Sequence, residues 1–345
     1  MRNEIRKDYL LDKWVIIAVE RAKRPTDFKT EVQEINKAVN CPFCAGNENM
    51  TPPARMLYIP VDDKKIIIDR DRNSEKRRSD WIIRVVPNLF PALQPSEKAE
   101  VFSNYVSKIS GIGDHEVIIE SPDHHEQIQV MSDDQVKLVF RAYRDRFRDL
   151  TSYDFVKFVS IFRNYGKKAG ASLSHPHSQI IATPIVPVSF FQEIKRLNFD
   201  GKRCKYDEII EHERKSERFI LERENVIAFS PFASTTPFEV WIFVKRHVHN
   251  ILELSDEERD DLAIATRDIL SAISKILNDP PYNYAIWQTV NEKEYHMHIR
   301  IFPRLTIYAG FEYNTNIAIN PVPPEHAAKY IRETLYEICK ITNGN

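Results

Sequence analysis

The two halves of this chain repeat one sequence pattern, and this repeat strongly limits the folds that the chain can adopt. Ser132 and Ser255 each begin a serine–acidic segment that follows a strand-like run of apolar residues. Later in each half comes a His-x-His motif, ending at His177 and at His298. The two serines are 123 residues apart and the two histidines 121, so order and spacing both indicate a duplicated strand–helix–strand–strand unit.

Each serine predicts the start of a long helix. Gln135 and Glu258 stand three residues after Ser132 and Ser255, which is the spacing of a capping box. Apolar residues then recur at helical spacing in both halves: Val136, Val139, Phe140, Tyr143 and Phe147 in the first, and Leu262, Ala265, Ile269, Ile273 and Ile276 in the second.

Short strands with one long helix per unit predict an α+β fold with antiparallel sheets, not a parallel doubly wound sheet. We expect a first unit over residues 1–190 and a second over 219–345. The charged stretch over 191–218 is expected to be the linker between them.

Composition excludes several classes of protein. The 345 residues carry 49 Lys+Arg against 50 Asp+Glu, so a large basic surface for nucleic acid is not expected. Only 8 glycines are present, which argues against a glycine-rich phosphate loop. No apolar run is long enough to span a membrane, so no membrane partner is expected. Four cysteines, of which only Cys41 and Cys44 are close in sequence, form no disulfide framework and predict a cytoplasmic protein.

The strongest local signal is Ser174-His-Pro-His-Ser-Gln179, followed by apolar residues typical of a strand. Residues two apart in a strand point the same way, so His175, His177 and Gln179 are expected on one face. A neutral imidazole can attack phosphorus and form a covalent phosphoramidate. The Gln179 amide can donate a hydrogen bond to phosphoryl oxygens. The alternative is a pair of surface histidines without chemistry.

The second signal is Cys41-Pro-Phe-Cys44, whose spacing lets both thiolates reach one zinc ion. Two more ligands are needed for a tetrahedral site. The candidates are His115, His124, His125 and His175. The alternative is a turn that carries two free thiols.

Two polar segments are candidates for binding phosphate. Arg21, Lys23 and Arg24 place three cations within four residues, which suits phosphate but is equally typical of a solvated face. Asn164 and Ser172 belong to a polar stretch that precedes the histidine motif and is either an anion site or a plain loop.

Together these motifs resemble the galactose-1-phosphate uridylyltransferase family, the transferase branch of the histidine-triad superfamily. They keep their order over nearly the whole chain: Trp14-Val-Ile-Ile, Arg21-Ala-Lys-Arg-Pro25, Cys41-Pro-Phe-Cys-Ala-Gly-Asn47, Pro87-Asn-Leu-Phe-Pro-Ala-Leu93, Ser121-Pro-Asp-His124, His175-Pro-His-Ser-Gln179, His296-Met-His298 and Gly310-Phe-Glu312. The resemblance implies two tandem histidine-triad-like units and a homodimer.

The resemblance also implies a double displacement in galactose metabolism. His177 takes a uridylyl group from UDP-glucose and releases glucose 1-phosphate, and galactose 1-phosphate then leaves as UDP-galactose. Gln179 stands where hydrolases of the superfamily carry a histidine, so it is expected to hold the covalent intermediate without promoting hydrolysis.

The remaining site residues follow from the same resemblance. A structural zinc is implied on Cys41, Cys44, His124 and His175. Positions that match those lining the nucleotide, its phosphates or the sugar are Arg21, Arg24, Asn88, Asn164, Ser172 and Glu312.

Three departures from the family pattern bear on function. Some members bind a second metal; Glu193, His296 and His298 match its ligands, but Gln288 replaces the fourth, so we do not expect that metal. Leu89 replaces an Asp in the family's Asn-Asp-Phe, which removes an acidic partner for the nucleoside. Residues 310–321 resemble a branch that includes ADP-glucose phosphorylases.

Two other functions therefore stay open. One is an ADP-glucose phosphorylase-like adenylyltransferase whose acceptor is inorganic phosphate. The other is a non-catalytic, zinc-stabilised nucleotide-binding protein.

Overall fold

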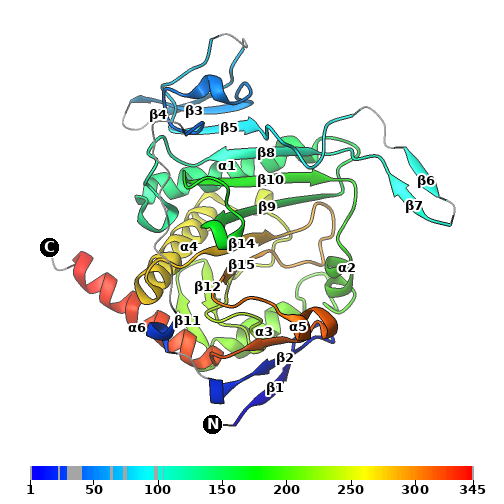
Figure 1. Cartoon of the computed structure of the whole chain (residues 1–345), viewed down its shortest axis with the longest axis vertical. Coiled ribbons are helices and arrows are strands. Elements are labelled where there is room, and N and C mark those ends of the chain that lie inside the picture. Colours follow the sequence, from blue (N-terminus) through cyan, green and yellow to red (C-terminus); the bar gives the residue numbers. More distant parts are fainter. Residues whose placement is uncertain are drawn as a thin grey trace.

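The computed structural model describes residues 2–21, 24–28, 41–62, 65–72, 76–96, 100–103 and 105–343. Within them an eleven-stranded sheet forms the body of the molecule, and all its pairings are antiparallel (Figure 1). In order across the sheet the strands are β11 (Phe219–Glu222), β12 (Val226–Phe229), β13 (Val240–Val244), β15 (His298–Pro303), β14 (Tyr282–Trp287), β9 (Phe158–Tyr165), β10 (His177–Thr183), β8 (Asp114–Ile119), β5 (Ile83–Pro87), β3 (Met56–Asp62) and β4 (Lys65–Asp69).

The repeat in the sequence is visible in the strand order. The first half runs β8, α1 (Asp133–Thr151), β9, β10, and the second runs β13, α4 (Asp256–Leu277), β14, β15. The two sets meet where β9 pairs with β14. Outward from this pair, β10 and β8 on one side correspond to β15 and β13 on the other. The α+β prediction is confirmed, and the two predicted sheets join edge to edge into one. Joining removes two exposed strand edges.

One face of the sheet is covered by the long helices. Side chains from α1, α4 and α6 (Pro324–Asn343) share one buried apolar cluster with alternate strand residues such as Ile118, Ile180, Ile242 and Ile299. Ser132 and Ser255 cap α1 and α4, as predicted. Ser255 and Glu258 form the full capping box, whereas the Gln135 amide turns away and donates to the Glu120 carbonyl.

The opposite face is covered by shorter segments. Over the second half lie α2 (Val188–Ile194) and α3 (Lys205–Glu213), with Phe190, Tyr206 and Ile210 packed on Phe229 and Phe243. The region predicted as a linker is thus partly helical and packed on the sheet. Over the first half, Cys41 and Phe43 pack on the residues that alternate with Ile118 in β8, Val117 and Ile119.

Smaller elements complete the chain. β1 (Glu4–Lys7) and β2 (Trp14–Ile17) pair with each other, and β16 (Ala318–Asn320) pairs in parallel with β2. β6 (Val101–Ser103) and β7 (Ser107–Ile109) form a projecting hairpin, and α5 (Gly310–Thr315) precedes β16 (Figure 1). Among the described residues, no helix has both the length and the apolar character needed to cross a membrane.

Candidate metal centre and active site

The histidine motif lies on the sheet face that the long helices leave uncovered. Ile180 and Ala182 of β10 belong to the cluster beneath those helices. His177 and Gln179 alternate with them and therefore point to the opposite face, as predicted. There the ring of Phe43 packs edge-on against His177, with the ring centroids 5.3 Å apart. The strand thus holds both predicted catalytic side chains on one surface.

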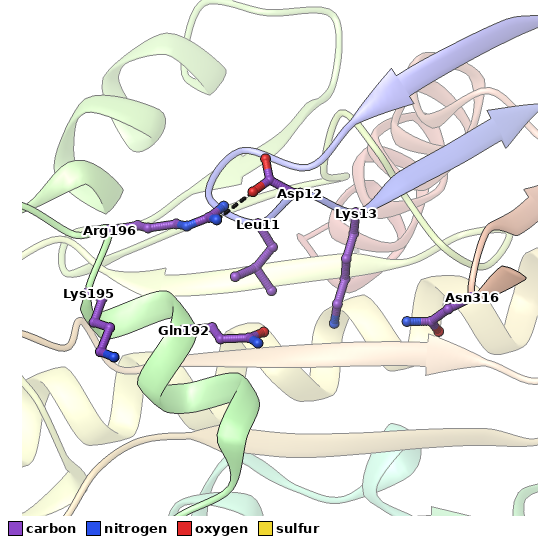
Figure 2. A pocket seen from close by; sticks show the side chains of 7 residues that line it. All are labelled: Leu11, Asp12, Lys13, Gln192, Lys195, Arg196 and Asn316. Atoms are coloured by element: carbon purple, nitrogen blue, oxygen red, sulfur yellow. Dashed lines mark hydrogen bonds and ion pairs between the residues drawn. The ribbon is translucent and has the colours of Figure 1, made fainter.

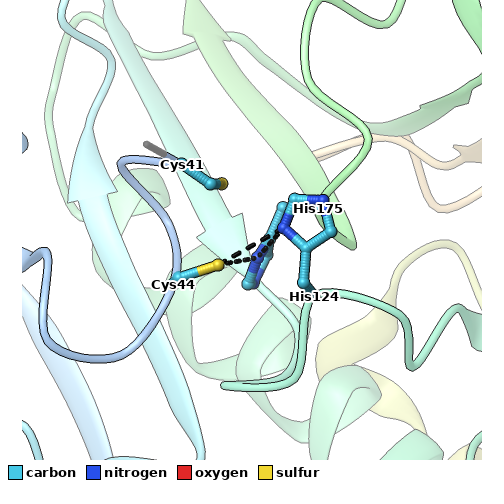
Figure 3. A group of neighbouring side chains, drawn as sticks. All are labelled: Cys41, Cys44, His124 and His175. Carbon is cyan, nitrogen blue, oxygen red and sulfur yellow. Dashed lines mark hydrogen bonds between the residues drawn. The ribbon is translucent and has the colours of Figure 1, made fainter. Parts of the chain in front are cut away.

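Beside them the structure gathers four side chains that could hold a metal ion. Cys41, Cys44, His124 and His175 each offer a ligand atom, and these atoms all lie within 4.8 Å of one another (Figure 3). The Cys44 Sγ is 3.3 Å from Nδ1 of His124 and 3.5 Å from Nδ1 of His175. The predicted ligand set is therefore brought together, from a loop, a second loop and the start of the histidine motif.

In His175 and His124, the ring nitrogen that points away from the cysteines, Nε2, has a polar partner. This arrangement favours metal binding at Nδ1, the nitrogen nearer the thiols. The Nε2 of His175 donates to the Ser121 carbonyl at 2.8 Å, which leaves Nδ1 with a lone pair directed at the thiols. The Nε2 of His124 lies 3.0 Å from the hydroxyl of Ser174. Such partners behind the ligands fix ring orientation in metal sites.

The protonation state of His175 also fits a bound cation. Burial lowers the pKa of His175 to about 4, so the ring is neutral and able to ligate. Burial and the neighbouring Cys41 raise the pKa of the Cys44 thiol to about 11 in the absence of a cation. A bound metal ion reverses that effect and deprotonates the thiols. Two sulfur and two nitrogen donors form the closed tetrahedral set of structural zinc sites.

The His177 ring is held in one tautomer. Its Nδ1 lies 2.7 Å from the backbone carbonyl of His175, and a carbonyl can only accept, so Nδ1 carries the hydrogen and Nε2 the lone pair. Burial lowers the pKa of His177, which keeps the ring neutral. The carbonyl that orients this ring belongs to a residue of the metal centre. A metal ion bound to His175 would thus help to fix the His177 ring, and with it the position of Nε2, through the short stretch of backbone between the two residues.

Gln179 is held by His115, a residue that we considered only as a metal ligand. The backbone N–H of Ala92 donates to Nδ1 of His115 at 3.1 Å, so Nε2 carries the hydrogen and donates to the Gln179 Oε1 at 2.8 Å. The Gln179 amide nitrogen is therefore turned outward. The Asn88 amide nitrogen lies 3.1 Å from the same Nε2, which places a third predicted site residue beside this pair.

A buried polar network lies beneath β10, on the helix face of the sheet. Ser178, between His177 and Gln179, bonds to the carboxylate of Glu120. Glu120 also accepts from Tyr143 at 3.0 Å and pairs with Arg163 at 2.9 Å. These groups are almost wholly buried, so the network ties β10 to its neighbours from below.

The corresponding histidine of the second half is blocked. His298 repeats the tautomer of His177, since its Nδ1 donates to the His296 carbonyl at 2.9 Å. However, its Nε2 accepts a hydrogen bond of 2.8 Å from Arg300, which stands two residues on, where the first half has Gln179. The Arg300 guanidinium is also paired with Glu193 at 3.1 Å and lies 3.6 Å from the centroid of Trp287.

Glu193 and His298 match family ligands of a second metal, but both side chains are thus engaged by Arg300. Gln288 is buried, and its Oε1 accepts from the Ile251 backbone N–H at 3.1 Å.

Among the described residues, none of the other predicted binding residues is hydrogen-bonded to His177, although the register of β9 against β10, with Gln179 opposite Phe162, brings Asn164 toward the His177 end of β10. Asn164, near the end of β9, accepts a hydrogen bond of 2.8 Å from Asn283 across the pair of central strands. Arg21, Arg24 and Ser172 are exposed, and Lys23 is outside the described residues. Glu312 accepts from the Ala309 N–H at 3.0 Å, at the start of α5. Within the described chain, no hydrogen bond or ion pair joins Arg21, Arg24, Ser172 or Glu312 to His177.

A separate cavity of about 420 Å³ lies where the β1–β2 loop approaches α2 (Figure 2). It is lined by Leu11, Asp12, Lys13, Gln192, Lys195, Arg196 and Asn316. Arg196 and Asp12 on its wall form an ion pair. None of the predicted site residues lines it.

Comparison with known proteins gives the chain its family. A family model described as "Domain of unknown function (DUF4921)" matches residues 112–342. An ADP-glucose phosphorylase from Arabidopsis thaliana is 36% identical, with 96% of this chain and 92% of the relative covered. The galactose-1-phosphate uridylyltransferase of Thermotoga maritima is 32% identical, with 97% and 99% covered. This chain belongs to the galactose-1-phosphate uridylyltransferase family.

Solved structures agree with that membership. The crystal structure of the Arabidopsis ADP-glucose phosphorylase with bound ADP-glucose matches with a TM-score of 0.76 and 32% identity, over 96% of this chain and 99% of that one. As a member of the uridylyltransferase family, the chain is a nucleotidyltransferase, so the predicted enzyme class is confirmed.

Proposed function

We propose that this enzyme transfers a nucleotidyl group by double displacement through His177. Nε2 of His177 attacks the inner phosphorus of a nucleoside diphosphate hexose. A P–N bond forms, the bridging P–O bond breaks, and the hexose 1-phosphate leaves with that bond's electrons. A phosphate oxygen of the acceptor then attacks the same phosphorus, and the P–N bond breaks to restore the imidazole.

The single observation that carries this proposal is the 2.7 Å hydrogen bond from Nδ1 of His177 to the His175 carbonyl. It leaves a lone pair on Nε2 of a neutral, buried ring, which is the form that a nucleophile needs. Gln179 supports the step, because His115 holds its Oε1 and its amide nitrogen, which has no hydrogen bond to any described residue, can donate to the phosphoryl oxygens.

We propose zinc as the ion held by Cys41, Cys44, His124 and His175. With four protein ligands the ion has no open position, so its contribution is structural. It would fix the His175 backbone and hence the orientation of the His177 ring. Zinc takes no part in the displacement itself.

For the donor we propose ADP-glucose, with inorganic phosphate as acceptor. The Arabidopsis relative named ADP-glucose phosphorylase is 36% identical to this chain, and the crystal structure of the Arabidopsis ADP-glucose phosphorylase contains bound ADP-glucose. Leu89, in place of the family's Asp, removes an acidic partner for the nucleoside. The second candidate pair is UDP-glucose and galactose 1-phosphate, supported by the 32% identity to the Thermotoga enzyme over nearly the whole chain. In both cases Arg21, Arg24, Asn88, Asn164, Ser172 and Glu312 are proposed to line the substrates.

The deciding experiment is intact-protein mass spectrometry after incubation with ADP-glucose or UDP-glucose and no acceptor. We expect a mass gain of one AMP, with glucose 1-phosphate released, and its loss when phosphate is added. A gain of one UMP, discharged by galactose 1-phosphate, selects the second candidate. His177→Ala should give no adduct, whereas His212→Ala, at a largely exposed position, should behave as wild type. No adduct with either donor would favour the non-catalytic binding protein.

We further propose a cytoplasmic homodimer with units over residues 1–190 and 219–345, joined by 191–218. The free thiols of Cys41, Cys44, Cys204 and Cys339 support a reducing compartment. The exposed apolar side chains of the β6–β7 hairpin, Phe102, Tyr105 and Val106 among them, support a contact with a second copy. Light scattering on the purified chain tests the dimer.

A further inference from the structure

The cavity between the β1–β2 loop and α2 carries an excess of positive charge. Its walls come from three segments that are far apart in the sequence: Leu11, Asp12 and Lys13 from the loop, Gln192, Lys195 and Arg196 from the end of α2, and Asn316 after α5. Three of these residues are cations and one is an anion, so the walls carry a net charge of +2. The volume of about 420 Å³ is in the range of sites for small molecules.

The one carboxylate of the cavity is already neutralised by its neighbours. The Arg196 guanidinium pairs with Asp12, and Nζ of Lys7, which is not a lining residue, lies 2.8 Å from Oδ1 of Asp12. Hydrogen bonds from Lys7 and Arg196 lower the pKa of Asp12 to about 2, so the carboxylate is charged at neutral pH. Nη1 of Arg196 also donates to the Leu10 carbonyl at 2.7 Å. Asp12 and Arg196 are thus occupied with each other, and Asp12 does not balance the two lysines.

The two lysines of the cavity lack a protein partner. Among the residues that the structure describes, the ammonium groups of Lys13 and Lys195 form no ion pair and no hydrogen bond, and the same is true of the side-chain amides of Gln192 and Asn316. In Figure 2 these two amides point toward the Lys13 ammonium group from opposite sides. Both lysines are exposed, so a ligand can reach them from solution. Ammonium groups attract a phosphoryl group, and amides pair with hydroxyl groups.

We propose that this cavity binds a phosphate monoester of the size of a sugar phosphate, at a site separate from His177. Lys13 and Lys195 would act as point charges for the phosphoryl group. The amides of Gln192 and Asn316 would bond to the hydroxyl groups of the ester. Leu11, which is only 5% exposed, would supply an apolar contact. Inorganic phosphate shares the charged part of this chemistry, and the experiment below distinguishes it from the ester.

Such a ligand would hold the β1–β2 loop against α2. β2 leads directly into the segment that ends at Arg21, one of the residues proposed to line the substrates. On α2, Gln192 is next to Glu193, which pairs with Arg300. A ligand that contacts both segments would stabilise the folded chain, because it binds only where they meet. The proposal does not rest on the chemistry of His177, and its test needs no nucleotide.

The test measures the rate at which individual lysines of the full-length chain are acetylated, by peptide mass spectrometry. The probes are glucose 1-phosphate, inorganic phosphate and glucose. With glucose 1-phosphate at about ten times its dissociation constant, we expect Lys13 and Lys195 to react about tenfold more slowly, because only the free fraction is accessible. Lys205, on α3 and 43% exposed, is the reference lysine and should react at an unchanged rate.

The three probes distinguish the possible occupants. Stronger protection by glucose 1-phosphate than by inorganic phosphate supports the ester, and equal protection by both identifies free phosphate as the occupant. Glucose alone should not protect, since it lacks the charge. Protection should persist in His177→Ala, and its loss in that variant would show that the effect comes from the active site.

A variant gives a second reading at the same site. In Lys13→Gln, the concentration of glucose 1-phosphate that protects Lys195 should rise about tenfold, because one charged contact with the phosphoryl group is lost. Lys205→Gln is the matched control and should leave that concentration unchanged. Since Lys13 is exposed, its replacement is not expected to disturb the fold. Equal acetylation of Lys13 and Lys195 with and without both phosphate compounds would overturn the proposal and leave the cavity as a gap filled by solvent.

Discussion

Nε2 of His115 donates a hydrogen bond of 2.8 Å to Oε1 of Gln179, and this bond decides which end of the glutamine amide faces outward. Without it the amide can turn its oxygen toward a phosphoryl group and repel it. We expect His115→Leu to lower the rate of nucleotidyl transfer by about tenfold, as expected for partial loss of a preorganised donor.

The measurement is a single-turnover assay that compares transfer with hydrolysis of the adduct. A larger share of hydrolysis in His115→Leu indicates a positioning role for His115, and His115→Gln, which can still donate, should recover part of the rate. The exposed variant His212→Leu serves as control. Equal rates in His115→Leu and wild type would remove this role.

The proposed zinc site should be needed for stability. Cys44→Ser replaces a soft ligand with a poor one, so we expect one fewer zinc ion per chain and a thermal midpoint several degrees lower, because metal binding contributes directly to folding. Calorimetry together with metal analysis provides the check. Cys339→Ser, at an exposed cysteine, should change neither quantity. An unchanged midpoint in Cys44→Ser would mean that the centre does not support the fold.

Arg163 and Glu120 form a buried ion pair beneath the histidine strand. Arg163→Leu would leave the Glu120 carboxylate buried without its cation, so we expect a loss of about 3–5 kcal/mol in the free energy of unfolding. Arg196→Leu removes the exposed pair with Asp12 and should cost about 1 kcal/mol or less. Denaturant titration of both variants gives the comparison, and similar losses would contradict this ranking.

Only one of the two repeated histidines should become labelled. The Nε2 of His298 accepts from Arg300, whereas the Nε2 of His177 has a lone pair that accepts no hydrogen bond from any residue that the structure describes. After incubation with the donor nucleotide, we expect one nucleotidyl group per chain, and peptide mapping should place it on His177. A labelled peptide that contains His298 would show that the Arg300 contact does not protect that ring.

Much of this architecture could be predicted from the sequence, because the repeat fixes the order of elements. Ser132 and Ser255 predicted both helix starts, since capping depends on a few neighbouring residues. The alternation in β10 predicted the shared face of His177 and Gln179 for the same local reason. The four predicted zinc ligands came from the resemblance, and the structure brings their side chains together.

Contacts between distant segments could not be predicted in this way. The join between β9 and β14 depends on how two edges meet, which the local pattern does not encode. The bond between His115 and Gln179 depends on the register of β8 against β10. Gln135 was expected to complete a capping box, but the Glu120 carbonyl offers its amide a competing partner.

The join between β9 and β14 also limits how the chain can be divided. Although each half repeats the same pattern, neither ends in a finished surface, because their edge strands face one another along Asn164 and Asn283 and the residues beside them. A fragment cut between the halves would present a bare strand with unpaired amides and carbonyls, prone to aggregate. If the two halves are expressed as separate chains, we expect them to be recovered in folded form only when both are produced in the same cell, so that β9 and β14 can pair.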